Sequence, residues 1–368
     1  MNKTVSIRRC TGYSAEALLP VVRTLYRDCD APPLKGKRVL IKPNILSDHP
    51  PETAVTTHPD VVEAVIRFVA EEGAEKIGVG DAPAMHGKKF NPVKCGIYDV
   101  CQRTGSEWLY FSEASSDRMV GKRKVSITQA LNGYDALISL PKLKTHSFMS
   151  LTGAIKNTFG VMPNLHKAAQ HAIHSNSKSF ASFLVDLTES ILPDFFLMDG
   201  IFAMEGDGPS NGQPKEIGAL LASTNPLALD IAAARLLGHA PETIPTNAEA
   251  IGRGKWLTGY DEIEYLGDDI DSLCVADFKR VEQSGINRIM LQYIVKYFPF
   301  LRKLERRPYF ERKQCAGCKA CVKICPQQAL LADKNNDKRI LLNDKLCIRC
   351  FCCQEVCPEN AIKIRGIM

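Results

Sequence analysis

Cysteines recur in two runs near the C-terminus, at residues 315–326 and 347–358, and their spacing limits the possible folds more than any other feature of the chain. Each run follows the pattern C-x2-C-x2-C-x3-C-P. In this pattern three thiolates wrap one face of an iron-sulfur cubane, while the fourth points away and binds a second cluster. The spacing therefore predicts a module that holds two [4Fe-4S] clusters.

The predicted ligand assignment is crossed between the two runs. One cluster is expected on the first cysteine set, Cys315, Cys318, Cys321 and Cys357, and the other on the second cysteine set, Cys347, Cys350, Cys353 and Cys325. Cys352 is an additional thiol, which we interpret as a non-ligand neighbour. The region resembles the two-cluster bacterial ferredoxins along its whole length. This resemblance implies a small α+β ferredoxin-like domain.

Two other uses of cysteine fit the sequence less well. Zinc ribbons need two C-x2-C pairs and leave no role for the remaining thiols of each run. A disulfide framework would indicate secretion, but the first ten residues lack the apolar core of a signal peptide. The other five cysteines are scattered and are expected to be free thiols: Cys10, Cys29, Cys95, Cys101 and Cys274.

Length and composition indicate a large globular domain with a small one appended. The chain has 368 residues, of which 45% are hydrophobic and 24% charged. No stretch approaches the roughly 18 apolar residues that a membrane span needs, so we expect no membrane span and a cytoplasmic protein. The net charge of +6 comes from the C-terminal part, because residues 1–278 carry −5. This distribution argues against nucleic-acid binding.

Strands and helices alternate through the first 240 residues. Strands are predicted at 37–44, 76–81, 107–111, 135–140, 194–200 and 217–221, and helices at 15–27, 59–72, 91–103, 151–159, 180–191 and 226–237. Such alternation is typical of an α/β fold with a mostly parallel sheet and helices on both faces. Binding sites in such sheets lie beyond the carboxyl ends of the strands.

The predicted domain boundaries follow from these patterns. Residues 1–278 form the α/β domain, 279–313 a basic amphipathic connector helix, and 314–368 the two-cluster domain. The apolar stripe of the connector could bind a membrane surface or a partner. We favour packing of the stripe on the main domain, since apolar helical stripes usually face a core.

Polar residues collect where predicted strands end, and lysine is common among them. The predicted substrate-binding residues are Lys42, Asn44, Asp81, Lys142, Lys144, Lys156 and Asn157, and the predicted proton donors are His58 and His146. Lysines and helix amino termini at strand ends suit a phosphate or carboxylate ligand. Each lysine alone could equally be a solvated loop residue. The loop 205–212 and the histidines 166, 171 and 174 offer only weak metal-binding patterns.

The large domain contains the short motifs Ile41-Lys-Pro-Asn44, Thr57-His-Pro-Asp60, Gly80-Asp-Ala-Pro83, Leu140-Pro-Lys-Leu-Lys-Thr-His146, Gly153-Ala-Ile-Lys-Asn157 and Gly208-Pro-Ser-Asn-Gly212. These motifs resemble a widespread prokaryotic family that is catalogued as a domain of unknown function and is often joined to a ferredoxin module. The similarity spans roughly residues 37 to 237. It implies that these polar positions form one site, but it supplies no reaction.

The leading functional hypothesis is an iron-sulfur oxidoreductase that passes electrons through both clusters to an anionic substrate or cofactor in the α/β domain. A redox partner such as a ferredoxin, flavodoxin or reductase would supply or receive them. The alternatives are an electron-transfer or assembly protein that docks a partner enzyme without its own active site, and structural or redox-sensing clusters beside other chemistry. Whether an additional organic cofactor binds is left open, since no nucleotide-binding glycine motif occurs.

The metal content tests the two-cluster prediction. Anaerobically purified protein should contain about eight irons and eight labile sulfides per chain, because each cubane holds four of each. Iron and sulfide analysis measures both. Stoichiometric zinc in place of iron would contradict the prediction.

Overall fold

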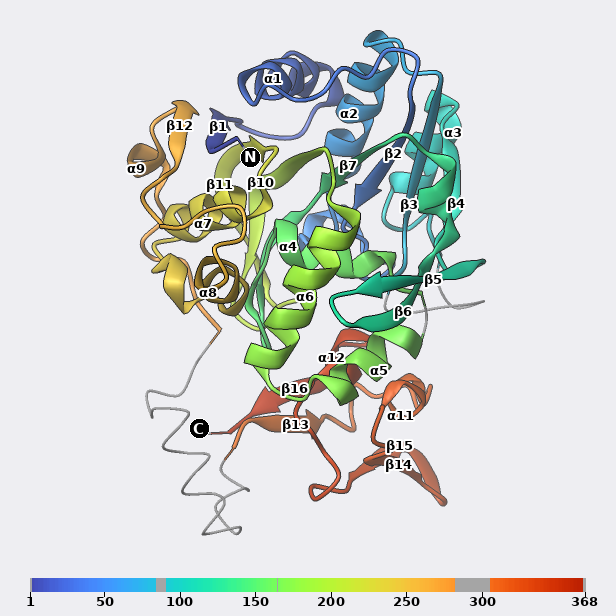
Figure 1. The fold of residues 1–368 in the computed structure, drawn as a ribbon. Helices are drawn as coiled ribbons and strands as arrows, with labels where there is room; N and C mark the ends of the chain where they lie inside the picture. Colours follow the sequence, from blue (N-terminus) through green and yellow to red (C-terminus); the bar gives the residue numbers. More distant parts are fainter. Residues whose placement is uncertain (1, 84–90, 164, 282–304, 367–368) are drawn as a thin grey trace.

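The fold was analysed in a computed structural model that describes residues 2–83, 91–163, 165–281 and 305–366. One large sheet runs through the first domain in the order β12-β1-β11-β10-β7-β2-β3-β4 (Figure 1). Its strands are β1 (Thr4–Arg9), β2 (Arg38–Pro43), β3 (Lys76–Asp81), β4 (Glu107–Tyr110), β7 (Ala136–Leu140), β10 (Phe195–Glu205), β11 (Gln213–Ser223) and β12 (Glu264–Gly267), and β8 (Lys142–His146) and β9 (Ser150–Thr152) pair beside β10.

Most neighbouring strands of this sheet are parallel. β10, β7, β2, β3 and β4 pair in parallel along the sheet, whereas β11 is antiparallel to both β10 and β1. Parallel pairing needs crossover connections, and the chain makes them with helices. The prediction of a mostly parallel α/β fold is confirmed.

Helices cover both faces of the sheet. They are α1 (Ala15–Asp28), α2 (Pro59–Glu71), α3 (Ile97–Thr104), α4 (Ala154–Asn157), α5 (Leu165–Ile173), α6 (Ser177–Ile191), α7 (Pro226–Leu236), α8 (Pro245–Gly252) and α9 (Ile270–Leu273). None of the helices in the described ranges is long and apolar enough to cross a membrane.

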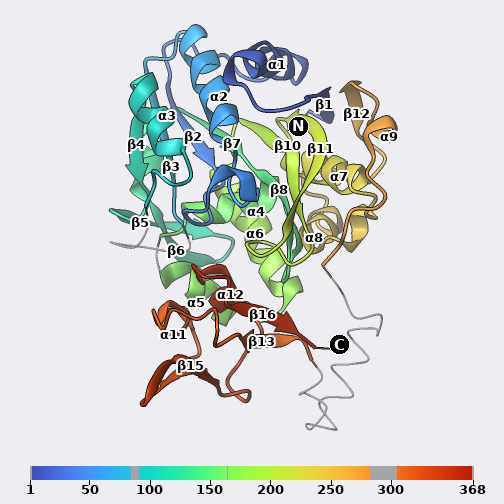
Figure 2. The same cartoon turned by 180° about the vertical axis from the view of Figure 1, so that it is seen from behind.

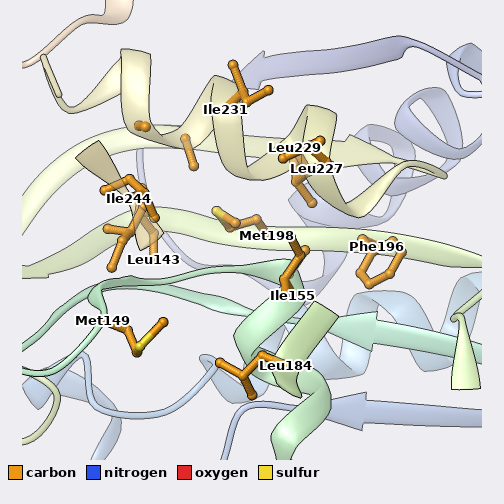
Figure 3. Packing of buried hydrophobic residues seen from close by; sticks show 14 of the residues in the cluster. Leu143, Met149, Ile155, Leu184, Phe196, Met198, Leu227, Leu229, Ile231 and Ile244 are labelled. Carbon is orange, nitrogen blue, oxygen red and sulfur yellow. The ribbon is translucent and has the colours of Figure 1, made fainter. Parts of the chain in front are cut away.

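Alternate residues of the central strands enter two separate hydrophobic cores. In β2, Val39 and Ile41 belong to the core under α1, α2 and α3, whereas Leu40 belongs to the core under α4, α6 and α7. This alternation follows from the two-residue period of a strand. Figure 3 shows the second core, where Leu184 of α6 lies near Ile155 of α4 and Met198 of β10. The sheet is thus buried on both faces, which holds its strand ends in fixed positions.

The strand order reverses between β2 and β7. From β2 the chain continues outward to β3 and β4, and it then returns to place β7 on the other side of β2. Lys42 at the end of β2 lies opposite Ser139 of β7. In open α/β sheets, ligands bind outside the carboxyl ends of the strands at such a switch point. The fold therefore favours a site beside Lys42.

The segment Lys142–His146 differs most from its predicted structure. It was expected as a lysine-rich strand end, but it forms strand β8, and all five of its residues are buried. It pairs with β10 in parallel and with β9 in antiparallel orientation. Because β9 takes residues 150–152, the helix predicted at 151–159 shortens to α4. The helix predicted from Asn91 begins only at Ile97, since Gly96 before it adopts a left-handed φ of 75°.

Several elements of the α/β domain were not predicted individually from the sequence, and four of them are strands at the margins of the fold. β1 and β12 form one edge of the sheet, and β5 (Ser115–Val120) with β6 (Arg123–Thr128) forms a separate hairpin. β5 alternates exposed and partly buried polar residues, so it lacks the apolar run from which the buried strands were recognised.

The C-terminal module is small, antiparallel and rich in cysteine. It consists of β13 (Arg307–Phe310), α11 (Ala320–Ile324), β14 (Leu330–Asp333), β15 (Asn336–Leu342), α12 (Cys352–Glu355) and β16 (Ile362–Arg365), with β13 paired to β16 and β14 to β15. The expected small α+β domain is confirmed. In Figures 1 and 2, α12 lies on the side of the module that faces the α/β domain.

Most of the predicted connector helix lies outside the described residues, since 282–304 are not described. Its helical structure and its apolar stripe therefore remain a prediction. Its C-terminal end was predicted wrongly, because Arg307–Phe310 forms strand β13, which pairs with β16 of the module.

Truncation of a core leucine tests the packing of the α/β domain. Leu184→Ala should lower the free energy of unfolding by about 2–5 kcal/mol, because the side chain is fully buried and leaves a cavity. Urea unfolding followed by tryptophan fluorescence measures this, since Trp108 and Trp256 both lie in this domain. Leu266→Ala is the matched control and should cost less than about 0.5 kcal/mol, because Leu266 is 44% exposed. Equal losses would contradict the assigned core.

Candidate functional site

A cavity lies between the carboxyl ends of the central strands and the C-terminal module, and we call it the central cavity. It encloses about 700 Å³, part of it open to solvent. The α/β domain contributes Asn44, Asp81, Lys144, His146, Thr152, Lys156, Asn157, Lys167 and His171 to its wall, and the module contributes Ile324, Cys352, Glu355 and Val356. Two regions far apart in the sequence thus form one chamber.

An ion pair between β2 and β3 lies at the inner end of this chamber. The Lys42 ammonium lies 2.9 Å from Asp81 Oδ1, and both side chains are almost fully buried. Burial lowers the pKa of Lys42, and the Asp81 charge opposes that shift. Asp81 also accepts hydrogen bonds from the Ile45 and Ala82 amides at 2.7 and 2.8 Å. A Cβ on Gly160 would fall 2.0 Å from Asp81 Oδ1, so only glycine fits beside the pair.

Two asparagines connect this pair to the cavity. Asn157 Oδ1 accepts a hydrogen bond from Asn44 Nδ2 at 3.0 Å and a longer one from Lys42 Nζ at 3.4 Å. Asn157 Nδ2 donates to Ser139 Oγ at 2.9 Å, which fixes the orientation of the amide. Asn44 Oδ1 is buried and has no hydrogen-bond partner among the described residues. Because both asparagines line the cavity, the free oxygen is available to a ligand hydroxyl or amine.

Strand β8 carries two buried lysines with different partners. Lys142 forms a 2.7 Å ion pair with Asp199. Lys144 lines the cavity and donates to the Val55 carbonyl at 2.6 Å. Burial lowers the pKa of Lys144 to about 7, aided by the nearby charge of Lys156. A neutral carbonyl cannot compensate a buried ammonium as a carboxylate does, so Lys144 favours an anion in the cavity.

Lys156 is the most exposed of these charges to a ligand in the cavity. Among the described residues its ammonium makes no hydrogen bond or ion pair, and it lies over the rings of Phe159 and Phe180 at 5.3 and 5.8 Å. Burial lowers its pKa. The short helix α4 that carries it is anchored by Asp230, which accepts from the Ala154 and Ile155 amides at 2.5 and 3.1 Å.

His146 joins the α/β domain to the module. Its Nδ1 accepts from the Phe148 and Met149 amides at 3.1 and 3.3 Å. The neutral ring therefore carries its proton on Nε2, which lies 3.3 Å from Glu355 Oε1 of α12. Burial lowers the pKa of His146 to about 4, and the Lys156 charge adds to this shift.

Two further hydrogen bonds cross between the domains. Ser147 Oγ donates to Gln354 Oε1 at 3.3 Å, and Asn211 Nδ2 donates to the Ile362 carbonyl at 3.0 Å. Together with the His146–Glu355 contact they attach the module beside α12 and β16. The shape of the cavity wall therefore depends on the position of the module against the α/β domain.

The structure separates two predicted site residues from the rest. His58 and Lys142 do not line the central cavity. They belong to a buried network in which the Tyr13 hydroxyl donates to Asp199 at 2.8 Å and the Lys142 ammonium lies 3.0 Å from that hydroxyl. The His58 ring stacks on Tyr13 at 3.5 Å. The other seven predicted residues line the cavity or, in the case of Lys42, lie directly behind its wall.

The nine module cysteines surround two further cavities. One is lined by all four cysteines of the first set and the other by all four of the second set, and Cys352 joins the second group. Four thiols around a cavity are the donors that a [4Fe-4S] cluster requires, so the residues present fit two such clusters. Among the described residues, no three His, Cys, Asp or Glu side chains converge as ligands of a single metal ion.

Several residues of the site were not recognised as such from the sequence. Lys167 of α5 donates to the Ala82 carbonyl, and burial lowers its pKa to about 8. His171 was considered with Lys167 only as part of a weak metal pattern, but its ring stacks on Phe180 at 4.4 Å. Glu355 lies between two predicted ligand cysteines in sequence, and nothing there indicates its contact with His146. Only the spatial arrangement of the two domains reveals these three residues.

Comparison with protein families identifies both parts of the chain. Residues 39–235 match the family described as "Domain of unknown function (DUF362)", and residues 307–358 match the "4Fe-4S dicluster domain". The chain therefore carries an iron-sulfur module for two [4Fe-4S] clusters.

Known proteins similar to the chain include one named relative and two solved structures. The chain is 34% identical to the thylakoid-associated protein sll1697 of Synechocystis over 265 residues, which cover 67% of this chain and 78% of that protein. Two solved structures are each 13% identical: a Thermotoga maritima protein (TM-score 0.34, 57% of this chain, 56% of that one) and the lactate racemase apoprotein of Thermoanaerobacterium thermosaccharolyticum (TM-score 0.37, 60% and 54%). The chain thus spans little more than half of either solved chain.

The pH dependence of stability tests the burial of Lys144. Its pKa is about 7 in the folded protein, against 10.5 for an unperturbed lysine. Between these values the unfolded chain binds a proton that the native protein has released, so stability rises with pH. The free energy of unfolding should increase by about 2 kcal/mol from pH 7 to 9 relative to a Lys144→Met variant. Urea unfolding of both proteins at each pH measures this, and identical pH profiles would contradict it.

Proposed function

The chain belongs to the family described as a domain of unknown function (DUF362), followed by a 4Fe-4S dicluster domain, and from this premise we propose that it is an iron-sulfur oxidoreductase. Electrons pass through the module to an anionic substrate or cofactor in the central cavity. The first and second cysteine sets are the proposed ligands of the two clusters.

One observation carries this proposal: the cavity is formed jointly by the lysine-bearing strand ends and by the module. Ile324 and Cys352 in its wall directly precede the proposed ligands Cys325 and Cys353 in sequence. An acceptor held in the cavity would therefore lie beside the residues that carry the electrons. A module that only docked a separate enzyme would not need to enclose a cationic chamber within its own chain.

Different residues of the cavity wall have different proposed roles. Lys144, Lys156 and Lys167 outnumber the acids Asp81 and Glu355, and Asp81 already pairs with Lys42. The lysines bind and orient the anion, and Asn44 Oδ1 accepts a hydrogen bond from it. When bound, each cubane gives or takes one electron at low potential. Because its pKa is about 4, His146 is neutral at neutral pH, and its Nε2–H serves as a hydrogen-bond donor at the cavity wall rather than as a source of protons. His58 and Lys142 support this wall from the adjacent network with Asp199.

The proposed partner is a one-electron carrier such as a ferredoxin or flavodoxin, or a reductase. For each electron that the carrier loses, the acceptor in the cavity gains one. We propose a cytoplasmic location, because a reducing compartment suits a chain in which four cysteines outside the module, Cys10, Cys29, Cys95 and Cys101, are free and buried. The name of the Synechocystis relative describes it as thylakoid-associated, and the proposed location of this chain does not rest on that name.

Reoxidation of the reduced protein tests the proposed activity. Dithionite-reduced protein, freed of excess dithionite under anaerobic conditions, is mixed with a panel of small carboxylates and phosphate esters, and the recovery of visible absorbance is followed. One class should reoxidise it. Lys156→Met should slow this step roughly 10- to 100-fold, since a charge-assisted hydrogen bond is worth about 1.5–3 kcal/mol.

Lys35→Met is the matched control, because Lys35 is exposed and lies before the amino end of β2, at the opposite edge of the sheet. Its reoxidation rate and the iron content of both variants should equal those of the unsubstituted protein. If only another protein reoxidises the clusters, or if Lys156→Met reacts at the normal rate, the cavity is not the site of reduction. The first outcome would favour a protein that docks a partner enzyme.

A further inference from the structure

The two cysteine sets are not equivalent in their relation to the central cavity. Cys352 lines both the central cavity and the cavity of the second set. The cavity of the first set shares no lining residue with the central cavity. A single side chain therefore separates the second set from the chamber, whereas the first set has no such common wall.

The path of the chain supports the same distinction. Two members of the second set, Cys325 and Cys353, directly follow the wall residues Ile324 and Cys352. In the first set only Cys357 follows a wall residue, Val356. The second set thus contacts the wall through both α11 and α12.

Cys352 also touches the second set itself. Its thiol is buried, and it lines the cavity of the second set together with all four cysteines of that set. Polar groups and solvent access close to a cluster adjust its potential. Cys352 is therefore placed to influence the second set from the cavity side.

Lys156 brings a positive charge to this wall. Lys156 lines the central cavity together with Cys352 and Glu355 of the module, and its ammonium makes no ion pair among the described residues. In a buried site such a charge is only weakly screened. A neighbouring positive charge stabilises the more negative, reduced state of a cluster, so it raises the potential of whichever cluster is nearer.

From these contacts we infer that the cluster held by the second cysteine set is the one that transfers electrons to the central cavity. We also infer that Lys156 raises the reduction potential of this cluster. This inference rests on the proposed function and adds the order of electron transfer. The first set would hold the cluster that takes one electron from the carrier protein, and the second set would hold the cluster from which that electron reaches the acceptor in the cavity. Lys156 affects this order of electron transfer through the reduction potential of the second cluster.

An EPR-monitored redox titration of the full chain tests the inference. Two variants assign the signals. Cys352→Ser changes a side chain in the wall of the second set's cavity and should alter the signal of the cluster that this set holds. Phe310→Leu should alter the signal of the first set, because Phe310 lines the cavity of the first set and neither of the others.

Lys156→Met should then shift the midpoint potential of the cluster held by the second set to a more negative value. The midpoint potential of the cluster held by the first set should not change. Methionine retains the length of the lysine stem and removes the charge. Lys156→Arg keeps the charge and should leave both midpoints in place, as should Lys35→Met. The inference is overturned if Lys156→Met shifts the first set, shifts both sets equally or shifts neither.

This measurement is independent of turnover. If no small anion reoxidises the protein but Lys156→Met still shifts only the second set, the order of the two sets stands and the proposed acceptor is wrong. If turnover depends on Lys156 but the shift falls on the first set, the cavity is an active site and the inferred outlet is wrong.

Discussion

Burial of lysine ammonium groups is the constraint on which the arrangement of this protein depends. A charged group removed from water is strongly destabilising unless the protein supplies a compensating partner. Lys42 and Lys142 receive carboxylates from Asp81 and Asp199, both within 3 Å. Lys144 receives only the Val55 carbonyl among the described residues, and Lys156 only two aromatic rings. The lysines with carboxylate partners, Lys42 and Lys142, stabilise the sheet. The lysines without such partners, Lys144 and Lys156, are the ones that favour an anion in the cavity.

The C-terminal module completes this arrangement. Glu355 supplies the carboxylate that faces the cavity from the module side, and its contact with His146 joins the two domains. Burial opposes the ionisation of Glu355, but its close contact with His146 and the Lys156 charge outweigh this effect and lower the pKa to about 2. Glu355 therefore remains ionised at neutral pH. The same residues that seat the module set the electrostatics of the cavity, so electron supply and anion binding become properties of one interface.

The sequence allowed much of this to be predicted where a local pattern carried the information. The cysteine spacing predicted the module, and apolar runs such as residues 76–81 predicted the buried strands. Contacts between residues that are far apart in the sequence are not indicated by any local sequence pattern. Lys142 and Lys144 were predicted to bind a ligand at a strand end, but their burial was not predicted, because it depends on Asp199 and Val55, which are far away in sequence. His58 was grouped with His146 because both follow predicted strands, although the fold places them in different environments.

The iron positions test the central claim, that the module presents the second cysteine set to a cationic cavity, most directly. An anomalous difference map at the iron edge, from anaerobically grown crystals of the full chain, would locate both clusters. The account predicts one peak within each cysteine set, with the peak of the second set nearer to Cys352 and the Lys156 ammonium than the peak of the first. A first-set peak nearer to Lys156, or a module seated away from His146, would contradict it.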